Sequence, residues 1–252
     1  MIRRLALATV LAAGGCTAAP IEIATLGQSA LSDGLIAHWA FDEGTGASVA
    51  DQSGNGHNGL LQGPAWSWTP AGRFGSSIHL SGSDVVTMTN FPAATTSYTV
   101  SAWVLVASTE LGAPVANLLS TEVPGGGWAL YTLTGGGPPT YAFRYAVNAP
   151  QQFWNAFCGC LIPDVWTHVA AVVDSEAGTL QLYVGAAPPV TTPVTTTVVP
   201  GSTTLNIGRS TLQQPGAAFP LLGALDDIAI YNRALGPEEI AALSTAPATN
   251  PH

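Results

Sequence analysis

Most of the chain consists of short runs in which apolar and polar residues alternate, separated by glycine, proline and other turn formers. Such runs include YTVSAWV at 98–104, WTHVAAVV at 166–173 and TLQLYVG at 179–185. Short runs rich in valine, threonine and aromatic residues predict β-strands with one buried face. A chain of 252 residues with this vocabulary fits one β domain, and it shows no repeat of helical-solenoid length.

The stretch 221–243, LLGALDDIAIYNRALGPEEIAAL, combines a strand pattern with a helix start. Regular alternation places Asp226 on the same strand face as Ile228 and Ile230, and Asp227 on the opposite face. A carboxylate on a buried face needs a cation or several hydrogen-bond donors beside it, because an unpaired buried charge is costly. After the strand, the sequence GPEE predicts a turn into a short helix with acids in its first turn.

A second acidic stretch follows a predicted strand at 35–41, where Asp42 is succeeded by DQSGNGHNG at 51–59. Glycines let a backbone fold tightly enough for carbonyl oxygens to converge, and calcium prefers oxygen ligands. Aspartate, serine, asparagine and glycine are also the standard residues of tight turns. From the residues alone, this stretch is either a calcium-binding loop or a pair of ordinary turns.

Several segments in a fixed order resemble bacterial laminin G-like domains with the concanavalin A-like jelly-roll fold. They are WAFDEGTGASVADQSGNGHNG near the start, YTVSAWV and WTHVAAVV in the middle, then TLQLYVG and LNIGR, and finally LDDIAIYNRAL. The resemblance covers residues 33–243. It implies an all-β fold, an antiparallel two-sheet jelly-roll sandwich with one short C-terminal helix.

The same resemblance implies a calcium ion that ties the N-terminal acidic turn to the last strand. The matching residues are Asp42 and Asp226 as carboxylate ligands, with Asp51, Asn55 and Gly56 as additional or carbonyl ligands. We therefore expect calcium as the cofactor, holding the two ends of the domain together.

The beginning of the chain has the pattern of an export signal. Two arginines precede an apolar run that is too short to span a bilayer as a mature helix. The small residues before Cys16 resemble a bacterial lipobox, which implies a signal peptide at 1–15, a lipidated Cys16 and a tether at 16–32. The alternative is an ordinary signal peptide cut nearby. We expect an exported protein, membrane-anchored or extracellular, with a disordered tail at 244–252.

Charge narrows the range of partners. The chain has six arginines, no lysine and fifteen acidic residues, for a net charge of −9. Such a surface repels nucleic acid and anionic lipid, and no basic patch offsets it. We therefore expect membrane contact only through the lipid anchor.

Residues 107–163 match the family pattern least and contain glycine- and proline-rich segments typical of loops. Loops on a rigid sandwich often carry binding specificity. The aromatic rings of Phe153, Trp154 and Phe157 either stack against sugar rings or pack the loop onto the sandwich.

Cys158 and Cys160 flank a single glycine in the same segment. In a straight strand, Cα atoms two residues apart are separated by about 6.6 Å, at the edge of what a disulfide can bridge. A disulfide here therefore requires a bend at Gly159, and an oxidising exported compartment favours it. A structural zinc site would need further ligands that the cysteines do not supply.

Paired carboxylates on one strand, as retaining glycosidases require, are missing from the sequence pattern. Asp174 and Glu176 lie between two predicted strands, where they mark a hairpin end, and Glu110 and Glu122 are isolated. The sequence thus predicts a non-catalytic recognition module for a glycan or a cell-surface protein. The alternatives are a glycoside hydrolase or polysaccharide lyase with its carboxylates on loops, and a structural envelope or adhesion component.

Overall fold

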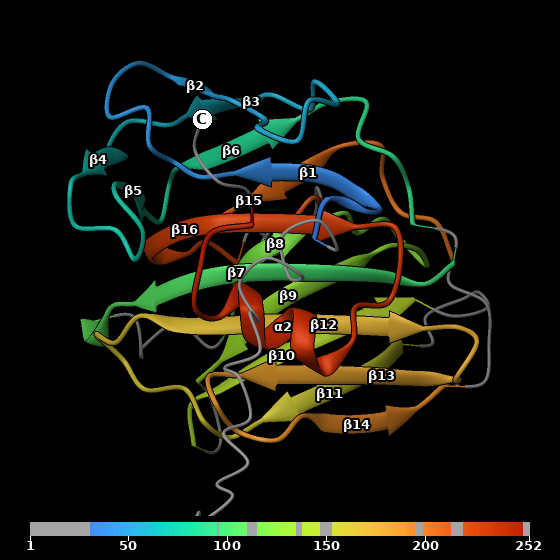
Figure 1. Cartoon of the computed structure of the whole chain (residues 1–252). Coiled ribbons are helices and arrows are strands. Elements are labelled where there is room, and N and C mark those ends of the chain that lie inside the picture. The colour runs from blue at the N-terminus through green and yellow to red at the C-terminus, as the bar shows by residue number, and fades with distance from the viewer. Residues whose placement is uncertain are drawn as a thin grey trace, which may run out of the picture.

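The computed structural model describes residues 31–94, 96–109, 115–134, 138–146, 153–194, 199–212 and 219–248, except for the side chains at positions 145, 146, 153 and 154. These residues form two antiparallel β-sheets packed face to face, with helix α2 (Pro237–Leu243) on the outside of one of them (Figure 1). The predicted all-β sandwich with a short C-terminal helix is confirmed.

The first sheet is organised around strand β16, which pairs with β7 along one edge and with β5 and then β1 along the other. Because β1 is the first strand and β16 the last, this pairing joins the two ends of the domain. The strand order is β14 (Val190–Pro193), β13 (Thr179–Val184), β12 (Thr167–Asp174), β7 (Tyr98–Val106), β16 (Leu222–Tyr231), β5 (Ser77–Ser81) and β4 (Ser67–Thr69), with β1 (Leu35–Trp39) beside β16.

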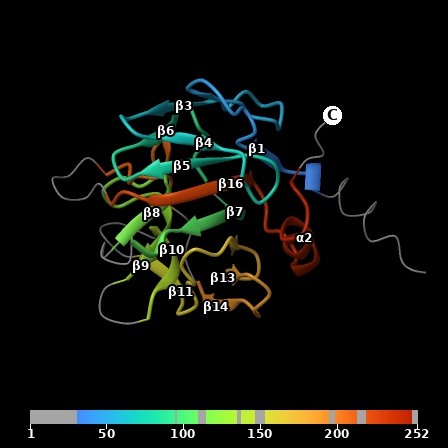
Figure 2. The same ribbon diagram turned by 90° about the vertical axis from the view of Figure 1, so that its left-hand side faces the viewer.

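The second sheet lies behind the first in Figure 1. Figure 2 shows the two sheets as separate layers, with α2 on the side of the first sheet that faces away from the second. Its order is β11 (Phe153–Cys158), β10 (Thr140–Ala146), β9 (Trp128–Leu133), β8 (Val115–Ser120), β15 (Leu205–Ile207), β6 (Val85–Met88), β3 (Gly59–Gln62) and β2 (Ser48–Val49). The chain therefore crosses between the sheets several times, as in a jelly roll.

The main core lies between the sheets and is filled by the inward-facing residue of each alternating pair. Its largest fully buried side chains include Trp39, Phe41, Tyr98, Tyr141 and Phe143. Burial of apolar surface of this kind contributes roughly 25 cal/mol per Å² removed from water, which makes this layer the main source of stability.

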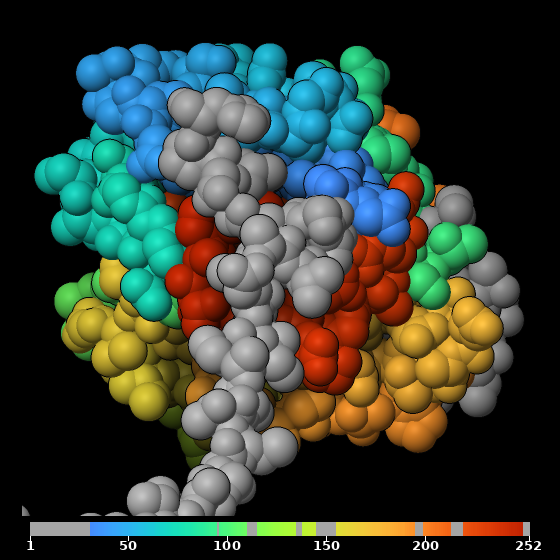
Figure 3. Space-filling model, viewed as in Figure 1, coloured from blue at the N-terminus to red at the C-terminus, as the bar shows by residue number. Residues whose placement is uncertain are grey.

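Helix α2 buries its apolar face against the outside of the first sheet, where Ile240 and Leu243 join a cluster that includes Val172 and Tyr231. In the space-filling view its surface lies beside that of the β12–β14 hairpins (Figure 3). Gly236 is the N-cap and Pro237 the first helical residue, as the sequence predicts.

The packed part of the chain extends beyond residues 33–243 at both ends. Leu31 and Ala248 are buried in the same cluster as α2. Residues 31 and 32, predicted as part of a tether, and residues 244–248, predicted as part of a disordered tail, thus belong to the ordered domain. Cys16 and the predicted signal peptide lie outside the described residues.

The predicted alternation along β16 is wrong at its centre. The pairing of β16 with β7 shifts register between Asp226 and Ala229, and Asp227 has a left-handed φ of 43°. This β-bulge adds one residue, so Leu225 and Ile228 both face the core while Asp226 lies on the outer face. Asp226 therefore does not share a face with Ile228 and Ile230.

Candidate functional site

The acidic turn at 51–59 is organised by the carboxylate of Asp51. Its Oδ1 accepts hydrogen bonds from the backbone N–H groups of His38 and Ser53, at 3.0 and 2.9 Å, and its Oδ2 accepts one from His57 at 2.9 Å. Burial raises the pKa of Asp51, but these hydrogen bonds outweigh burial and hold the pKa below its usual 3.8. Asp51 therefore fixes the turn against β1.

Asn55 has a similar local role. Its amide nitrogen donates to the backbone oxygens of Leu35 and Ile36, at 2.9 and 2.8 Å, which ties the turn to the start of β1. Gly56, like Gly54, has a left-handed φ, which a tight turn requires. The interpretation as ordinary turns accounts for the side chains of Asp51 and Asn55.

Asp42 and Asp226 lie differently, because both reach the loop at residues 72–76. Asp42 Oδ1 accepts a hydrogen bond from the Ser76 N–H at 2.7 Å, and Asp226 Oδ2 accepts one from the Phe74 N–H at 2.8 Å. A side chain at Gly72 or Gly75 would collide with this arrangement: a Cβ at Gly75 would meet the Asp42 carboxylate, and one at Gly72 would meet Asp226. The two glycines thus allow two carboxylates, 184 positions apart in sequence, to approach one loop.

The second oxygen of Asp226 is the unsatisfied atom of this site. Asp226 is fully buried, and its Oδ1 has no hydrogen-bond partner among the described residues. Burial raises the pKa of Asp226 to about 7, against the opposing effect of the Phe74 N–H and with a further contribution from the charge of Asp227. A buried acceptor of this kind costs free energy unless a cation or a proton occupies it.

Calcium fits this donor set by its chemistry. The two carboxylates are hard oxygen ligands of the type calcium prefers, whereas the contacts of the loop to them come from its N–H groups. Within the part of the chain that the structure describes, no three His, Cys, Asp or Glu side chains gather closely enough to hold a metal ion. A calcium ion here would thus depend on Asp42, Asp226, backbone oxygens and water.

Asp227 belongs to a separate structure that the sequence pattern does not reveal. Its Oδ1 lies 2.6 Å from His38 Nε2, and its Oδ2 accepts a hydrogen bond from the Ala248 N–H at 3.2 Å. All three residues are buried on the outer face of the first sheet. Asp227 thus links the first strand, the last strand and the segment after α2. The signal that could have located it is the double aspartate, since a bulge favours a residue that tolerates a left-handed φ.

The outer face of the second sheet carries a row of polar residues on β8, β9, β10 and β11. Arg144 of β10 is opposite Asn155 of β11, and Asn117 of β8 is opposite Tyr131 of β9. Phe157 lies two residues beyond Asn155, on the same face of β11, and 48% of its surface is exposed. Among the described side chains, these strands thus present the exposed ring of Phe157 beside polar groups.

A buried ion pair holds this polar row in place. Glu122 is 2% exposed and binds Arg144, whose guanidinium Cζ lies 5.4 Å from the centre of the Tyr131 ring. Burial raises the pKa of Tyr131 to about 12, so its hydroxyl stays protonated and donates to Asn155 Oδ1 at 3.4 Å. The guanidinium is fixed by a carboxylate and by an aromatic ring, which preorganises the partly exposed side chain of Arg144.

Of the three aromatic residues predicted to bind a ligand, the structure describes the side chain of only one. Phe157 is exposed on β11, whereas the side chains of Phe153 and Trp154 lie outside the described residues, although their backbone belongs to β11.

Cys158 and Cys160 form a disulfide with their Cα atoms 5.3 Å apart, which is shorter than the separation in a straight strand. The chain therefore bends at Gly159, immediately after the exposed aromatic ring.

The described acidic residues that were considered for catalysis have structural contacts of their own. Asp174 Oδ1 accepts the backbone N–H groups of Glu176 and Ala177, as expected for the end of the β12–β13 hairpin. Glu122 is occupied by Arg144, and Glu110 lies outside the described residues.

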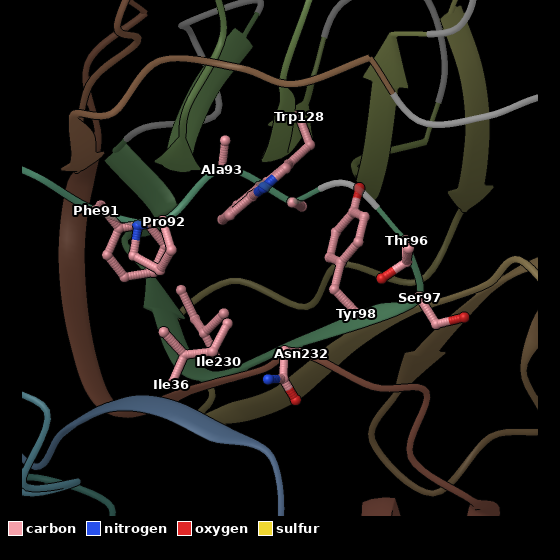
Figure 4. Close-up of a pocket in the computed structure, with 11 residues that line it drawn as sticks. Ile36, Phe91, Pro92, Ala93, Thr96, Ser97, Tyr98, Trp128, Ile230 and Asn232 are labelled. Carbon is pink, nitrogen blue, oxygen red and sulfur yellow. The ribbon is translucent and has the colours of Figure 1, made fainter.

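A cavity of about 170 Å³ opens between the two sheets, beside the described residues 91–94 and 96–97, which lie between β6 and β7 in sequence (Figure 4). Phe91, Tyr98 and Trp128 line it from three directions, and Ile36 and Ile230 form part of its floor. It is separate from the polar row, because these side chains face the core between the sheets and the polar row faces outward.

The two-sheet sandwich with its crossing strands and covering helix defines the class of protein as a jelly-roll domain. The family model of Laminin_G_3, in the concanavalin A-like lectin/glucanases superfamily, matches residues 80–241, and the chain belongs to this family. No curated protein matches the sequence.

Solved structures with the same fold include carbohydrate-binding and protein-binding examples. Domain 4 of AbnA, a GH43 extracellular arabinanase from Geobacillus stearothermophilus in complex with arabinotriose, is 20% identical, with 84% of this chain and 98% of that chain covered and a TM-score of 0.63. The binding domain of botulinum neurotoxin DC in complex with rat synaptotagmin II is 16% identical over 85% of this chain and 52% of that chain, with a TM-score of 0.63.

A third structure, of botulinum neurotoxin type C, whose cell entry depends upon interaction with two ganglioside molecules, is 16% identical over 86% of this chain and 52% of that chain, with a TM-score of 0.64. The chain thus spans about half the length of the neurotoxin chains. At these identities the likeness establishes the fold alone. Across the described ranges, no helix has the length and apolar character needed to cross a membrane.

Proposed function

We propose that this protein is an exported, lipid-anchored, non-catalytic module that recognises carbohydrate and holds a structural calcium ion. The observation that carries the proposal is the exposed ring of Phe157 beside Arg144 and Asn155 on one face of the second sheet. A flat aromatic surface next to fixed polar groups matches the alternating C–H faces and hydroxyl groups of a sugar.

The comparisons support carbohydrate as the ligand class. The arabinanase domain, which this chain matches over nearly the full length of that domain, is seen with arabinotriose, and the type C neurotoxin interacts with gangliosides. Both share the fold of this chain, although neither identity is high enough to carry over a binding residue. The binding surface proposed here is therefore argued from this chain's own side chains.

Replacing Phe157 with alanine should weaken binding of arabinotriose or another bound oligosaccharide by about tenfold, since a stacked aromatic ring contributes about 1 kcal/mol or more. Ile162→Ala is the matched control, because Ile162 is 60% exposed but lies on the loop after β11. Isothermal titration on the variants and the wild type decides the matter. Equal affinity of Phe157→Ala and wild type, for a glycan that does bind, would place the site elsewhere.

The proposal that the module is non-catalytic rests on the carboxylates. In the described residues Glu122 is paired with Arg144, and Asp174 closes a hairpin turn. Retaining glycoside hydrolysis needs two carboxyl groups about 5 to 5.5 Å apart that are available to the substrate, whereas the contacts of these two carboxylates give each of them a structural role. The same titration samples should therefore contain only intact oligosaccharide after long incubation.

The calcium proposal rests on two observations. Among the described residues, Asp226 Oδ1 has no hydrogen-bond partner, and Asp42 contacts the same loop, residues 72–76, as Asp226 does. A bound cation would neutralise a carboxylate that is otherwise costly to bury, and it would join β16 to the turn after β1.

Export and anchoring rest on the sequence pattern before Cys16. In a bacterial host, the full-length protein should partition with membranes and incorporate labelled fatty acid, because an acyl chain supplies apolar surface that the charged domain lacks. Cys16→Ser should release the protein from the membrane fraction. A Cys16→Ser form that partitions with membranes as strongly as wild type would exclude the lipid anchor.

A cell-surface protein is the second candidate ligand. Ile162 and Val165 are 60% and 47% exposed on the loop between β11 and β12, and exposed apolar residues of this size favour protein contact. The binding domain of botulinum neurotoxin DC, which has the same fold, is in complex with rat synaptotagmin II, and this supports a protein as the alternative ligand.

A further inference from the structure

The cavity between the sheets lies in a region that is otherwise closely packed. Tyr98 and Trp128 stack at 6.1 Å between ring centroids, and Trp128 and Phe143 stack at 5.9 Å, which builds one rigid aromatic wall. Phe91 lies on the other side of the cavity, anchored by the hydrogen bond from its N–H to the Thr203 oxygen at 2.7 Å. The cavity of about 170 Å³ opens to solvent past Thr96 and Asn232, so a small molecule can enter it.

The walls of the cavity select against polar occupants. Phe91, Tyr98 and Trp128 are each no more than 3% exposed, and Ile36 and Ile230 add aliphatic surface. A sugar ring placed here would lose water from its hydroxyl groups without enough partners to replace it. An apolar cavity of about 150 Å³ is known to stay dry and to bind a molecule the size of benzene, so the space fits one six-membered aromatic ring.

The mouth of the cavity is polar. Thr96 and Asn232 are exposed at its rim, and Ser97 is beside them (Figure 4). A ligand with an aromatic ring at one end and a hydroxyl or similar group at the other could leave the polar group among these side chains.

We propose that the cavity between the two sheets binds a small molecule with a single aromatic ring and one polar substituent, of the phenol or benzyl alcohol type. The ring inserts between Phe91 and the Tyr98–Trp128 wall, and the polar substituent stays at the Thr96–Asn232 mouth. This site is independent of the proposed carbohydrate surface, which lies on the outer side of the second sheet.

Titration of the full-length protein with phenol, followed by two-dimensional NMR, tests the proposal. We expect saturable shifts of the Trp128 indole N–H and of the backbone amides at Ala93 and Thr96, with a dissociation constant of about 1 mM or tighter. 2-Naphthol, which has two fused rings, and arabinose, which has a polar ring of similar size, should leave these resonances unchanged at equal concentrations.

Ala94→Leu should weaken phenol binding by about tenfold or more, because Ala94 lines the cavity and the added carbons fill it. Ala177→Leu makes the same change on the exposed β12–β13 turn and should bind phenol like wild type. The proposal is overturned if phenol produces no saturable shifts, if arabinose or 2-naphthol shifts the same resonances, or if Ala94→Leu binds phenol as well as wild type. The comparison of ring sizes needs only wild-type protein, so it decides the matter even if Ala94→Leu does not fold.

Discussion

Calcium at about 100 times its dissociation constant should stabilise the protein by roughly 2.7 kcal/mol, as a ligand that binds only the folded state does. The physical reason is Asp226, whose fully buried carboxylate has one oxygen without a partner among the described residues. Thermal melts with excess calcium and with a chelator measure this gain directly.

Proton and calcium should compete for the same carboxylate. Burial raises the pKa of Asp226 to about 7, above its unfolded value of 3.8. The protonated carboxyl group therefore stabilises the calcium-free fold fully below about pH 4. This stabilisation is lost as the pH rises through 7. Calcium requires the ionised form, so its apparent affinity should rise by about tenfold between pH 6 and pH 8.

Asp226→Asn tests the calcium site most specifically, because it removes the charge and keeps a hydrogen-bond acceptor. The amide oxygen can still accept the Phe74 N–H, but the buried charge is removed, so the variant should lose the calcium response. At pH 8 without calcium it should be at least as stable as wild type. Identical melting temperatures of the wild type with calcium and with chelator would eliminate the site and leave Asp42 and Asp226 as turn-stabilising residues.

Asp227→Ala should lower the free energy of unfolding by about 3 kcal/mol with or without calcium, because it removes the buried carboxylate that contacts a buried histidine and a buried N–H. His38 Nε2 and the Ala248 N–H both contact this carboxylate. Alanine at a left-handed φ adds strain. Urea unfolding at two calcium concentrations separates this loss from the calcium effect.

Asp227→Asn is the control for backbone strain, since asparagine tolerates the same backbone conformation. It should be less destabilised than Asp227→Ala, while still responding to calcium like wild type. A variant at Asp227 that keeps full stability but loses the calcium response would assign the metal to Asp227 instead of Asp226.

The fold could be predicted from the sequence because its signals are local and mutually consistent. Alternation in β7, β12 and β13 defines strands with one face toward the core, and Gly236 and Pro237 mark the start of α2. The order of these motifs supplied the topology through family resemblance, which alternation alone could not provide.

The orientation of Asp226 and Asp227 could not be predicted, because a bulge inserts one residue and inverts the alternation beyond it. Regular pairing placed the two carboxylates on opposite faces, and the structure places both on the outer face with different partners. The pattern of polar residues does not reveal this bulge, because the bulge depends on how β1, β5 and β7 pair with the two edges of β16.

The polar row on the second sheet was also missed, for a different reason. Glu122 follows β8, whereas Tyr131 and Arg144 lie on β9 and β10, and none of the three belongs to a recognisable motif. Their meeting depends on the register of β8, β9 and β10, which no short motif encodes. Phe157 was predicted either to stack against a sugar ring or to pack its loop onto the sandwich. Its ring is 48% exposed and so is accessible to a ligand, but its role in binding stays a prediction.

A crystal structure of the protein grown with arabinotriose and calcium tests the proposed recognition surface most directly. The account predicts a sugar ring against the exposed face of Phe157, with hydrogen bonds from the sugar hydroxyl groups to Asn155 and Arg144 and with the oligosaccharide intact. A sugar bound on the first sheet, or one held between two carboxylates with its glycosidic bond cleaved, would contradict the account.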